Sequence, residues 1–187
     1  MTKKAEIEKE VLDEAYRRGY DYCARIACAP GVFAAVMETL GYEKDPSVND
    51  VWKATIGLAG GTGNLAIGTC GAMAGAAMAI SFSFGFTKED VLKDPEKMLK
   101  VNRVVAEVGK EMQEKYGHIQ CEEVQFHNWG KSYRFTNPKA QQEFMSARAL
   151  WTACQEVTGD LAKWTVQKIL EHNPHFSKRK TKKRDKT

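Results

Sequence analysis

Thiol side chains are the residues of this sequence best suited to chemistry. The chain has five cysteines, and no two of them form a C-x-x-C pair. This spacing excludes a zinc ribbon and a thioredoxin motif, and the absence of C-x-x-C-H excludes covalently attached c-type haem. Four of the cysteines lie on four different predicted elements: Cys28, Cys70, Cys121 and Cys154.

Three of these cysteines stand at or just before a predicted helix start: Cys28, Cys70 and Cys121. Unpaired N–H groups and the helix dipole favour an anion there, so we expect a lowered thiol pKa and a better ligand or nucleophile. The alternative for any single cysteine is a small apolar residue that fills the core. Position alone leaves both interpretations open.

The stretch "GGTGNLAIGTCGAMAG", residues 60–75, contains six glycines and no charge. Its segment Gly61–Ala66 matches the G-x-G-x-x-A pattern of dinucleotide-binding turns. That chemistry needs a preceding buried strand and an acidic residue about 20 positions later, on a second strand. The pattern predicts a small-residue helix instead, and the P-loop lysine is absent, so phosphate binding is disfavoured.

The chain from Ala54 to Thr87 carries no charged residue and is long enough to span a bilayer. Its glycines and hydroxyl groups favour a buried helix of a bundle over a membrane helix. Gly71, Gly75 and Ala79 are four residues apart and share one helical face, which lets a neighbouring backbone come close. We therefore expect an all-α fold, a compact helical bundle around this central small-residue helix.

Periodicity and helix-boundary residues place the other helices. We expect them at about residues 4–25, from Pro30 to Leu40, at 48–56, 95–116, near Cys121, from Pro138 through Cys154, and from a break at Gly159 to Asn173. A short extended segment at 133–135 is the one strand-like pattern.

A resemblance to a known family rests on the motif Cys70-Gly71-Ala72-x-x-Gly75 and its flanks. Before it stand "CAPGVFAAVM" and "GLAGGTGN", and after it "GHIQCEEV" and "ALWTACQEVTGDLA". The chain resembles the redox-active protein family named for its cysteine pattern, C_GCAxxG_C_C, over about residues 25–165. That family is related to the iron–sulfur part of split-Soret cytochromes.

The resemblance implies that an all-helical fold gathers the four shared cysteines as metal ligands: Cys28, Cys70, Cys121 and Cys154. Four thiolates suit an iron–sulfur cluster and, as a weaker alternative, tetrahedral zinc. Cys23 lies outside the pattern, and on one continuous helix it would not share a face with Cys28. Two sets of glycines would permit close approach, Gly60, Gly61, Gly63 and Gly68 beside the cluster, and Gly71 and Gly75 beside a neighbouring helix.

The resulting hypothesis is a redox-active protein that transfers electrons to or from an unknown redox partner. The sequence leaves open whether the chain forms a homo-oligomer. A rival hypothesis is an enzyme that acts on a small molecule near a chemically varied loop, with these candidate residues: His118, His127, Trp129, Tyr133 and Arg134. A metal-free thiol–disulfide protein and a structural or adaptor protein are two further hypotheses that the sequence leaves open.

Charge and composition define the domain boundary. The net charge is +4, but seven of the lysines and arginines fall in the last ten residues, beside the single acid Asp185. We expect one domain over residues 1–176 and a disordered basic tail over 177–187, which would contact an acidic partner, nucleic acid or an anionic membrane. The charged N-terminus lacks the apolar core of a signal peptide, so we expect a cytoplasmic protein.

The tail yields a first test. Truncation before Ser177 is expected to leave helical content and any bound metal unchanged, because the tail offers no apolar group to offset the entropy of ordering. Circular dichroism and metal analysis measure both, and only salt-sensitive binding is expected to weaken. Loss of helical signal on truncation would contradict this division of the chain.

Overall fold

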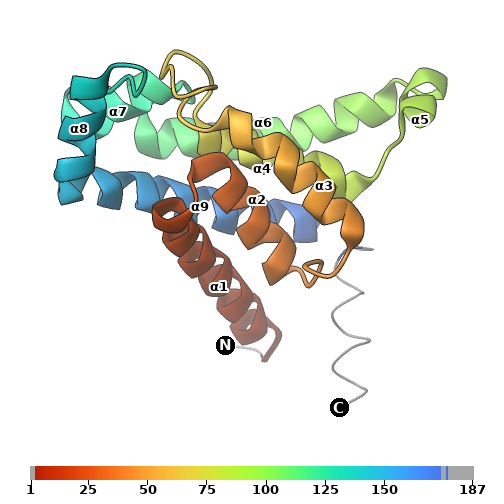
Figure 1. Cartoon of the computed structure of the whole chain (residues 1–187). Helices are drawn as coiled ribbons and strands as arrows, with labels where there is room; N and C mark the ends of the chain where they lie inside the picture. Colours follow the sequence, from red (N-terminus) through yellow and green to blue (C-terminus); the bar gives the residue numbers. More distant parts are fainter. Residues whose placement is uncertain (1–2, 174–175, 177–187) are drawn as a thin grey trace.

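The computed structural model describes residues 3–173 and Phe176, with the side chains of residues 3–7 and 148–150 left out (Figure 1). The helices are α1 (Lys3–Arg25), α2 (Cys28–Thr39), α3 (Pro46–Thr55), the 3₁₀ turn η1 (Ile56–Leu58), α4 (Gly71–Phe84), α5 (Lys88–Lys93), α6 (Glu96–Tyr116), α7 (Cys121–Trp129), α8 (Pro138–Ser146) and α9 (Arg148–His172). Over the described residues no strand forms, and the expected extended segment at 133–135 is irregular. The all-α prediction is confirmed.

Helix α4 lies at the centre of the bundle, where it packs against α2, α6 and α9. The largest fully buried side chains come from these helices and include Phe33, Met37, Ile80 and Leu161. Helix α1 packs on α9 and α2, while α5 and the α7–α8 pair lie at opposite ends of the long α6 (Figure 1). The small-residue helix is therefore the central element, as predicted.

Side-chain caps explain several helix boundaries. Asp45 accepts a hydrogen bond from the Ser47 N–H, and Pro46 occupies the first turn of α3, where its missing donor costs nothing. Thr87 and Asp90 form a reciprocal capping box at the start of α5, a short helix that periodicity alone did not indicate. A cap thus fixes a helix too short to carry a clear apolar stripe.

Helix α9 is continuous through Gly159, so the expected break at this glycine is wrong. A Cβ on Gly159 would lie 2.9 Å from the Tyr16 ring, and one on Gly19 would lie 2.6 Å from the Thr158 carbonyl oxygen. Both glycines therefore serve the close crossing of α1 and α9. The chain breaks earlier, at Ala147, which separates α8 from α9.

The uncharged stretch from Ala54 to Thr87 forms the end of α3, η1, a loop and α4. Among the helices of the described residues, none has the length and apolar character that crossing a membrane would require. Residues 177–187, which we expect to form the basic tail, lie outside the described residues. Just before them, the Phe176 ring stacks on Tyr42 with centroids 4.0 Å apart.

Gly75 tests the contact between α4 and α2. Replacement by Ala would drive a Cβ into the Ala29 carbonyl oxygen, which belongs to the backbone and cannot rotate away. We expect Gly75→Ala to lower the free energy of unfolding by about 1–3 kcal/mol, measured by urea denaturation, and Gly75→Leu to cost more. The matched control is Gly57→Ala, where nothing lies within 4 Å of a new Cβ. Equal stability of both Ala variants would contradict the close contact.

Candidate functional site

One cavity of about 240 Å³ is lined by all five cysteines. Cys28 begins α2, Cys70 precedes α4, Cys121 begins α7, and Cys154 lies within α9. The structure therefore brings together the four cysteines that the resemblance implied. It also adds Cys23 of α1, which was expected not to share a face with Cys28 on one continuous helix. The chain breaks between Arg25 and Cys28, as the predicted helix boundaries imply, so the argument from one continuous helix does not apply to Cys23.

The loop that precedes Cys70 is joined to the segment around Cys121. Three backbone hydrogen bonds connect them: Cys121 N–H to the Gly68 carbonyl (2.9 Å), Glu122 N–H to the Ala66 carbonyl (2.8 Å) and Cys70 N–H to the Ile119 carbonyl (2.8 Å). The loop thus supplies acceptors for the free N–H groups at the start of α7. These backbone hydrogen bonds hold Cys70 and Cys121, which are far apart in sequence, next to each other.

The same loop has an unusual backbone. Six of the residues from Gly60 to Ala66 have positive φ: Gly60, Gly61, Thr62, Gly63, Asn64 and Ala66. Non-glycine residues in this region are strained, and such strain is concentrated at functional sites. At Gly61, a Cβ would also lie 2.7 Å from the Cys121 Cβ. Glycine is required there both for conformation and for the approach to a cysteine.

Hydrogen-bond donors reach two of the sulfur atoms. The Gly60 N–H donates to Cys28 Sγ at 3.4 Å, and the Gln125 side-chain amide donates to Cys121 Sγ at 3.3 Å. Gly71 also lies against the Cys28 sulfur, so a Cβ there would collide with it. This contact differs from the helix–helix role we expected for Gly71. The site therefore has N–H groups placed to stabilise negative charge on sulfur.

Burial raises the pKa of all five thiols, so the expected lowering is wrong. Backbone N–H groups at the helix starts do act to lower the pKa of Cys28 and Cys70, but desolvation outweighs them. The pKa of Cys121 rises to about 11 and that of Cys23 to about 12. Cys28 and Cys70 do lie at helix starts, but the backbone N–H groups there lower the thiol pKa by less than burial raises it.

Two of the glycines expected beside a cluster lie elsewhere. A Cβ on Gly63 would meet nothing within 4 Å, so this residue serves the turn and not a close approach. A Cβ on Gly68 would lie 2.7 Å from the Gly61 carbonyl oxygen, which is a contact inside the loop. Close approach to a cysteine thus belongs to Gly60, Gly61 and Gly71.

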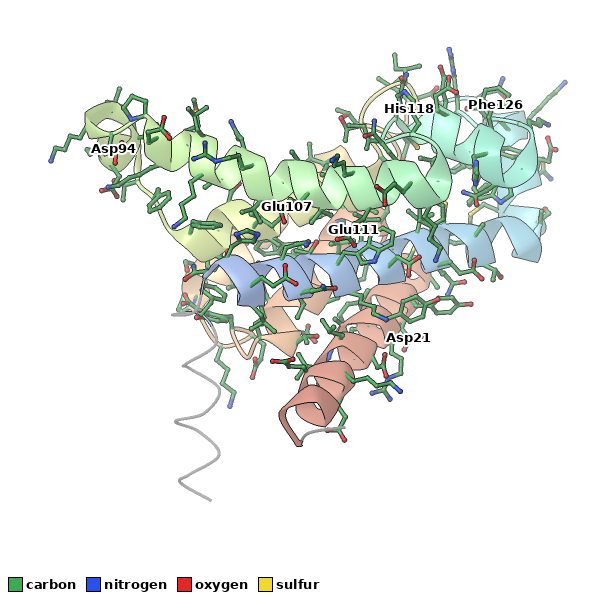
Figure 2. The ribbon with its side chains drawn as sticks, turned by 180° about the vertical axis from the view of Figure 1, so that it is seen from behind. Asp21, Asp94, Glu107, Glu111, His118 and Phe126 are labelled. Atoms are coloured by element: carbon green, nitrogen blue, oxygen red, sulfur yellow. The ribbon has the colours of Figure 1, made fainter. Side chains whose placement is uncertain are left out.

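Of the five candidate loop residues, Trp129 alone lines the cavity. Its indole N–H is buried with no hydrogen-bond partner among the described residues. His118 is exposed and accepts a hydrogen bond from the Gln120 N–H, at the outer surface in Figure 2, and His127 is exposed as well. The other two are engaged elsewhere, Tyr133 with Glu143 and Arg134 with Glu122. Of these five candidates, Trp129 therefore contributes the one side chain to the site.

Sequence reasoning missed other residues of the cavity wall. Gln125 binds the Cys121 sulfur and also accepts the Tyr133 N–H at 2.6 Å, so it joins α7 to the following loop. Its position four residues after Cys121 on a helix is a signal that could have identified it. The aromatic side of the cavity, Phe135, Phe144 and Trp151, carries no comparable signal in the sequence.

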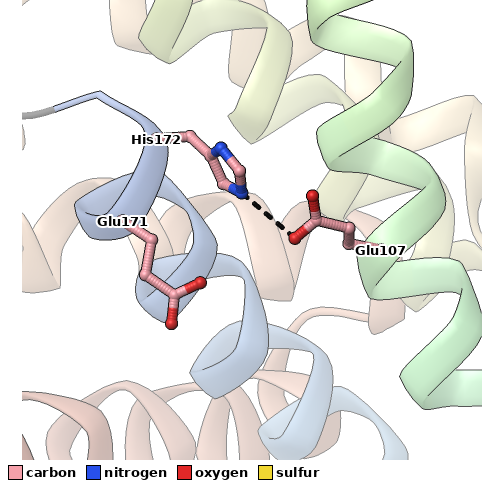
Figure 3. Close-up of side chains that lie close together, drawn as sticks. All are labelled: Glu107, Glu171 and His172. Atoms are coloured by element: carbon pink, nitrogen blue, oxygen red, sulfur yellow. Dashed lines mark hydrogen bonds and ion pairs between the residues drawn. The ribbon is translucent and has the colours of Figure 1, made fainter.

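A second group of ligand-type side chains lies between α6 and α9 (Figure 3). Within the described part of the chain, Glu107, Glu171 and His172 are the three such residues with ligand atoms within 4.8 Å of one another. Lys168 contacts both carboxylates, at 3.3 and 3.1 Å, and His172 lies 3.0 Å from Glu107. The group is an ion-pair cluster in which Lys168 already contacts both carboxylates.

The cavity defines the class of protein: an all-α bundle with five buried or half-buried free thiols around one space. The family model described as "Putative redox-active protein (C_GCAxxG_C_C)" matches residues 26–168. The chain belongs to this family, so its coarse class is redox-active. No curated protein and no solved structure matches the chain significantly.

The left-handed loop yields a matched pair of variants. Gly61→Ala is expected to cost more stability than Gly63→Ala, since both residues have positive φ but Gly61 alone would press a Cβ on Cys121. The strain alone is worth about 1–2 kcal/mol at either position, and the clash adds about 1–3 kcal/mol at Gly61. Urea denaturation measures the difference. Equal losses would show that the loop does not press on Cys121.

Proposed function

We propose that the cavity binds an iron–sulfur cluster through Cys28, Cys70, Cys121 and Cys154, and that the protein transfers electrons. The observation that carries the proposal is the convergence of these thiols, from four separate elements, on one largely apolar cavity. Inert cysteines that merely fill a core have no physical reason to converge on a space. Thiolates are the usual protein ligands of such clusters.

The size and spacing of the site fit a cluster. A cavity of about 240 Å³ exceeds the roughly 150 Å³ that accommodates benzene in an engineered protein core. A single zinc ion bound at about 2.3 Å would hold its four sulfurs about 3.8 Å apart. Within the described residues, no three cysteine sulfurs lie within 4.8 Å of one another.

The surrounding residues would tune such a group. An iron–sulfur cluster exchanges single electrons, at a potential set by hydrogen bonds to sulfur and by solvent exposure. Here the Gly60 N–H and the Gln125 amide supply hydrogen bonds, and the aromatic side of the cavity would limit the access of water. The five raised thiol pKa values mean that loading must release protons, so it is favoured by rising pH.

Electron exchange also requires access from outside. Ile26 and Met145 line the cavity yet are 45% and 59% exposed, so the site reaches the surface at an apolar rim. A redox partner would approach there. Five free thiols favour a reducing compartment, and we propose the cytoplasm.

An enzyme is the second candidate, because the cavity contains more than sulfur ligands. The buried indole N–H of Trp129 has no partner among the described residues, and Asn128 and Gln141 add polar groups to the wall. A small molecule held there would complete the hydrogen bonding of Trp129. Quenching of tryptophan fluorescence by the bound molecule, absent in Trp129→Phe, would favour this candidate.

The test is metal analysis of the anaerobically purified full-length chain. We expect iron, acid-labile sulfide and a broad visible absorbance in the wild type, and loss of all three in Cys70→Ser, because Cys70 is a proposed ligand with sulfur in the cavity. Cys23→Ser is the control and is expected to keep nearly all of its iron. Iron content that survives loss of any two proposed ligands would overturn the proposal.

Absence of iron in the wild type would overturn it as well. A colourless protein with reversible disulfides would support a metal-free thiol–disulfide function. A colourless protein whose thiols do not react would support a structural or adaptor role.

A further inference from the structure

Cys23 is a thiol in the cavity that the family match does not include. It belongs to α1, which ends at Arg25, whereas the family model begins at residue 26. Its side chain is 4% exposed and lines the cavity with the other four cysteines. The chain thus brings five thiols to a site for which four ligands suffice.

The close crossing of α1 and α9 places Cys23 beside Cys154. Gly19, one helical turn before Cys23, lies against the Thr158 carbonyl and Gly159. Thr158 follows Cys154 by one turn, and its hydroxyl donates to the Cys154 carbonyl at 2.8 Å. The Gln155 side-chain amide donates to the Tyr20 carbonyl at 3.3 Å, in the same antiparallel register of α1 and α9. Cys23 and Cys154 therefore lie at the same level of the crossing.

Two of the other three cysteines are held by N–H donors to sulfur. Gly60 donates to Cys28 and the Gln125 amide donates to Cys121, while Cys70 precedes α4 without a side-chain cap hydrogen bond. Among the described residues, no N–H donor reaches the Cys154 sulfur, which lines the cavity together with Cys23. The sulfurs of Cys28 and Cys121 are thus fixed by donors, and that of Cys154 is not.

We propose that Cys23 is an alternative ligand for the position of Cys154, so that the cluster site has two interchangeable thiols on the α1–α9 side. The inference rests on the proposed function and concerns the same cavity. It gives α1 a chemical role in addition to packing, and it makes the ligand position of Cys154 exchangeable.

Cys154 is the preferred ligand of the two. Cys23 lies in the last turn of α1, where the free carbonyls and the negative end of the helix dipole disfavour a thiolate. Cys154 lies well inside α9, away from both helix ends. Cys23 therefore replaces Cys154 when that thiol is removed or modified, and contributes little while Cys154 is present.

Serine variants test the exchange, with iron per chain and the visible spectrum as readouts. We expect Cys154→Ser to keep about half or more of the wild-type iron with an altered spectrum, and the double variant Cys23→Ser/Cys154→Ser to keep less than about a tenth. Cys70→Ser is the matched control, since no second thiol accompanies that position and iron is expected to be lost whether or not Cys23 is present. Circular dichroism verifies that each variant is folded.

A thiol cross-linker gives a readout that does not need bound iron. Dibromobimane, which fluoresces when it joins two thiols within its short reach, is expected to link Cys23 to Cys154 in metal-free wild type, as peptide mapping by mass spectrometry would show. A wild type that binds iron, with Cys154→Ser as depleted as Cys70→Ser, would overturn the exchange and leave the proposed function standing. A wild type that binds no iron would overturn the proposed function, and the exchange that rests on it.

Discussion

Close backbone contact at a few glycines is the constraint on which the cysteine cavity depends. Gly75 lies against Ala29, the neighbour of Cys28, and brings α4 onto α2. Gly61 lies against Cys121, and Gly19 lies against α9 one turn after Cys154. A cysteine side chain is short, so its sulfur reaches a common space only when the backbones that carry it nearly touch. The glycines and the cysteines are thus two parts of one arrangement.

This arrangement has an electrostatic cost that gives the site its chemical character. The same close packing that gathers the thiols removes them from water, and desolvation raises the pKa of each one. Donors such as the Gly60 N–H and the Gln125 amide offset only part of that effect. A cation in the cavity would supply the missing compensation, because thiolates bound to a metal are stable at neutral pH. A buried set of thiols without such compensation would be a poor nucleophile and a poor thiolate source.

The sequence allowed much of this to be predicted, for identifiable reasons. The helices could be predicted from apolar periodicity and from the Pro and Gly residues at their boundaries. The gathering of the four cysteines could be predicted from the order of the motifs that contain them. Gly159 was misinterpreted, because a glycine that breaks a helix and one that admits a neighbouring helix look identical until Tyr16 is placed beside it. Cys23 was kept apart from the site by an argument that holds only for one continuous helix, although the predicted helix boundaries already place a break between Cys23 and the next helix. The error at Gly159 arises from a tertiary contact between distant segments, which local patterns do not encode.

Helix α1 is the part of the cavity wall that lies outside the region matched by the family model. The family model covers the segment that holds Cys28, Cys70, Cys121 and Cys154, and α1 lies wholly before it. Yet α1 packs along α9 and α2, and Tyr22 and Arg18 both bind Glu38 of α2, so α1 is fastened to the two helices that carry Cys154 and Cys28. A helix fixed in this way brings Cys23, in its last turn, to one side of the cavity. Since solvent exposure is one of the main influences on the potential of a buried redox group, α1 is the element through which this chain would adjust the potential of the proposed cluster.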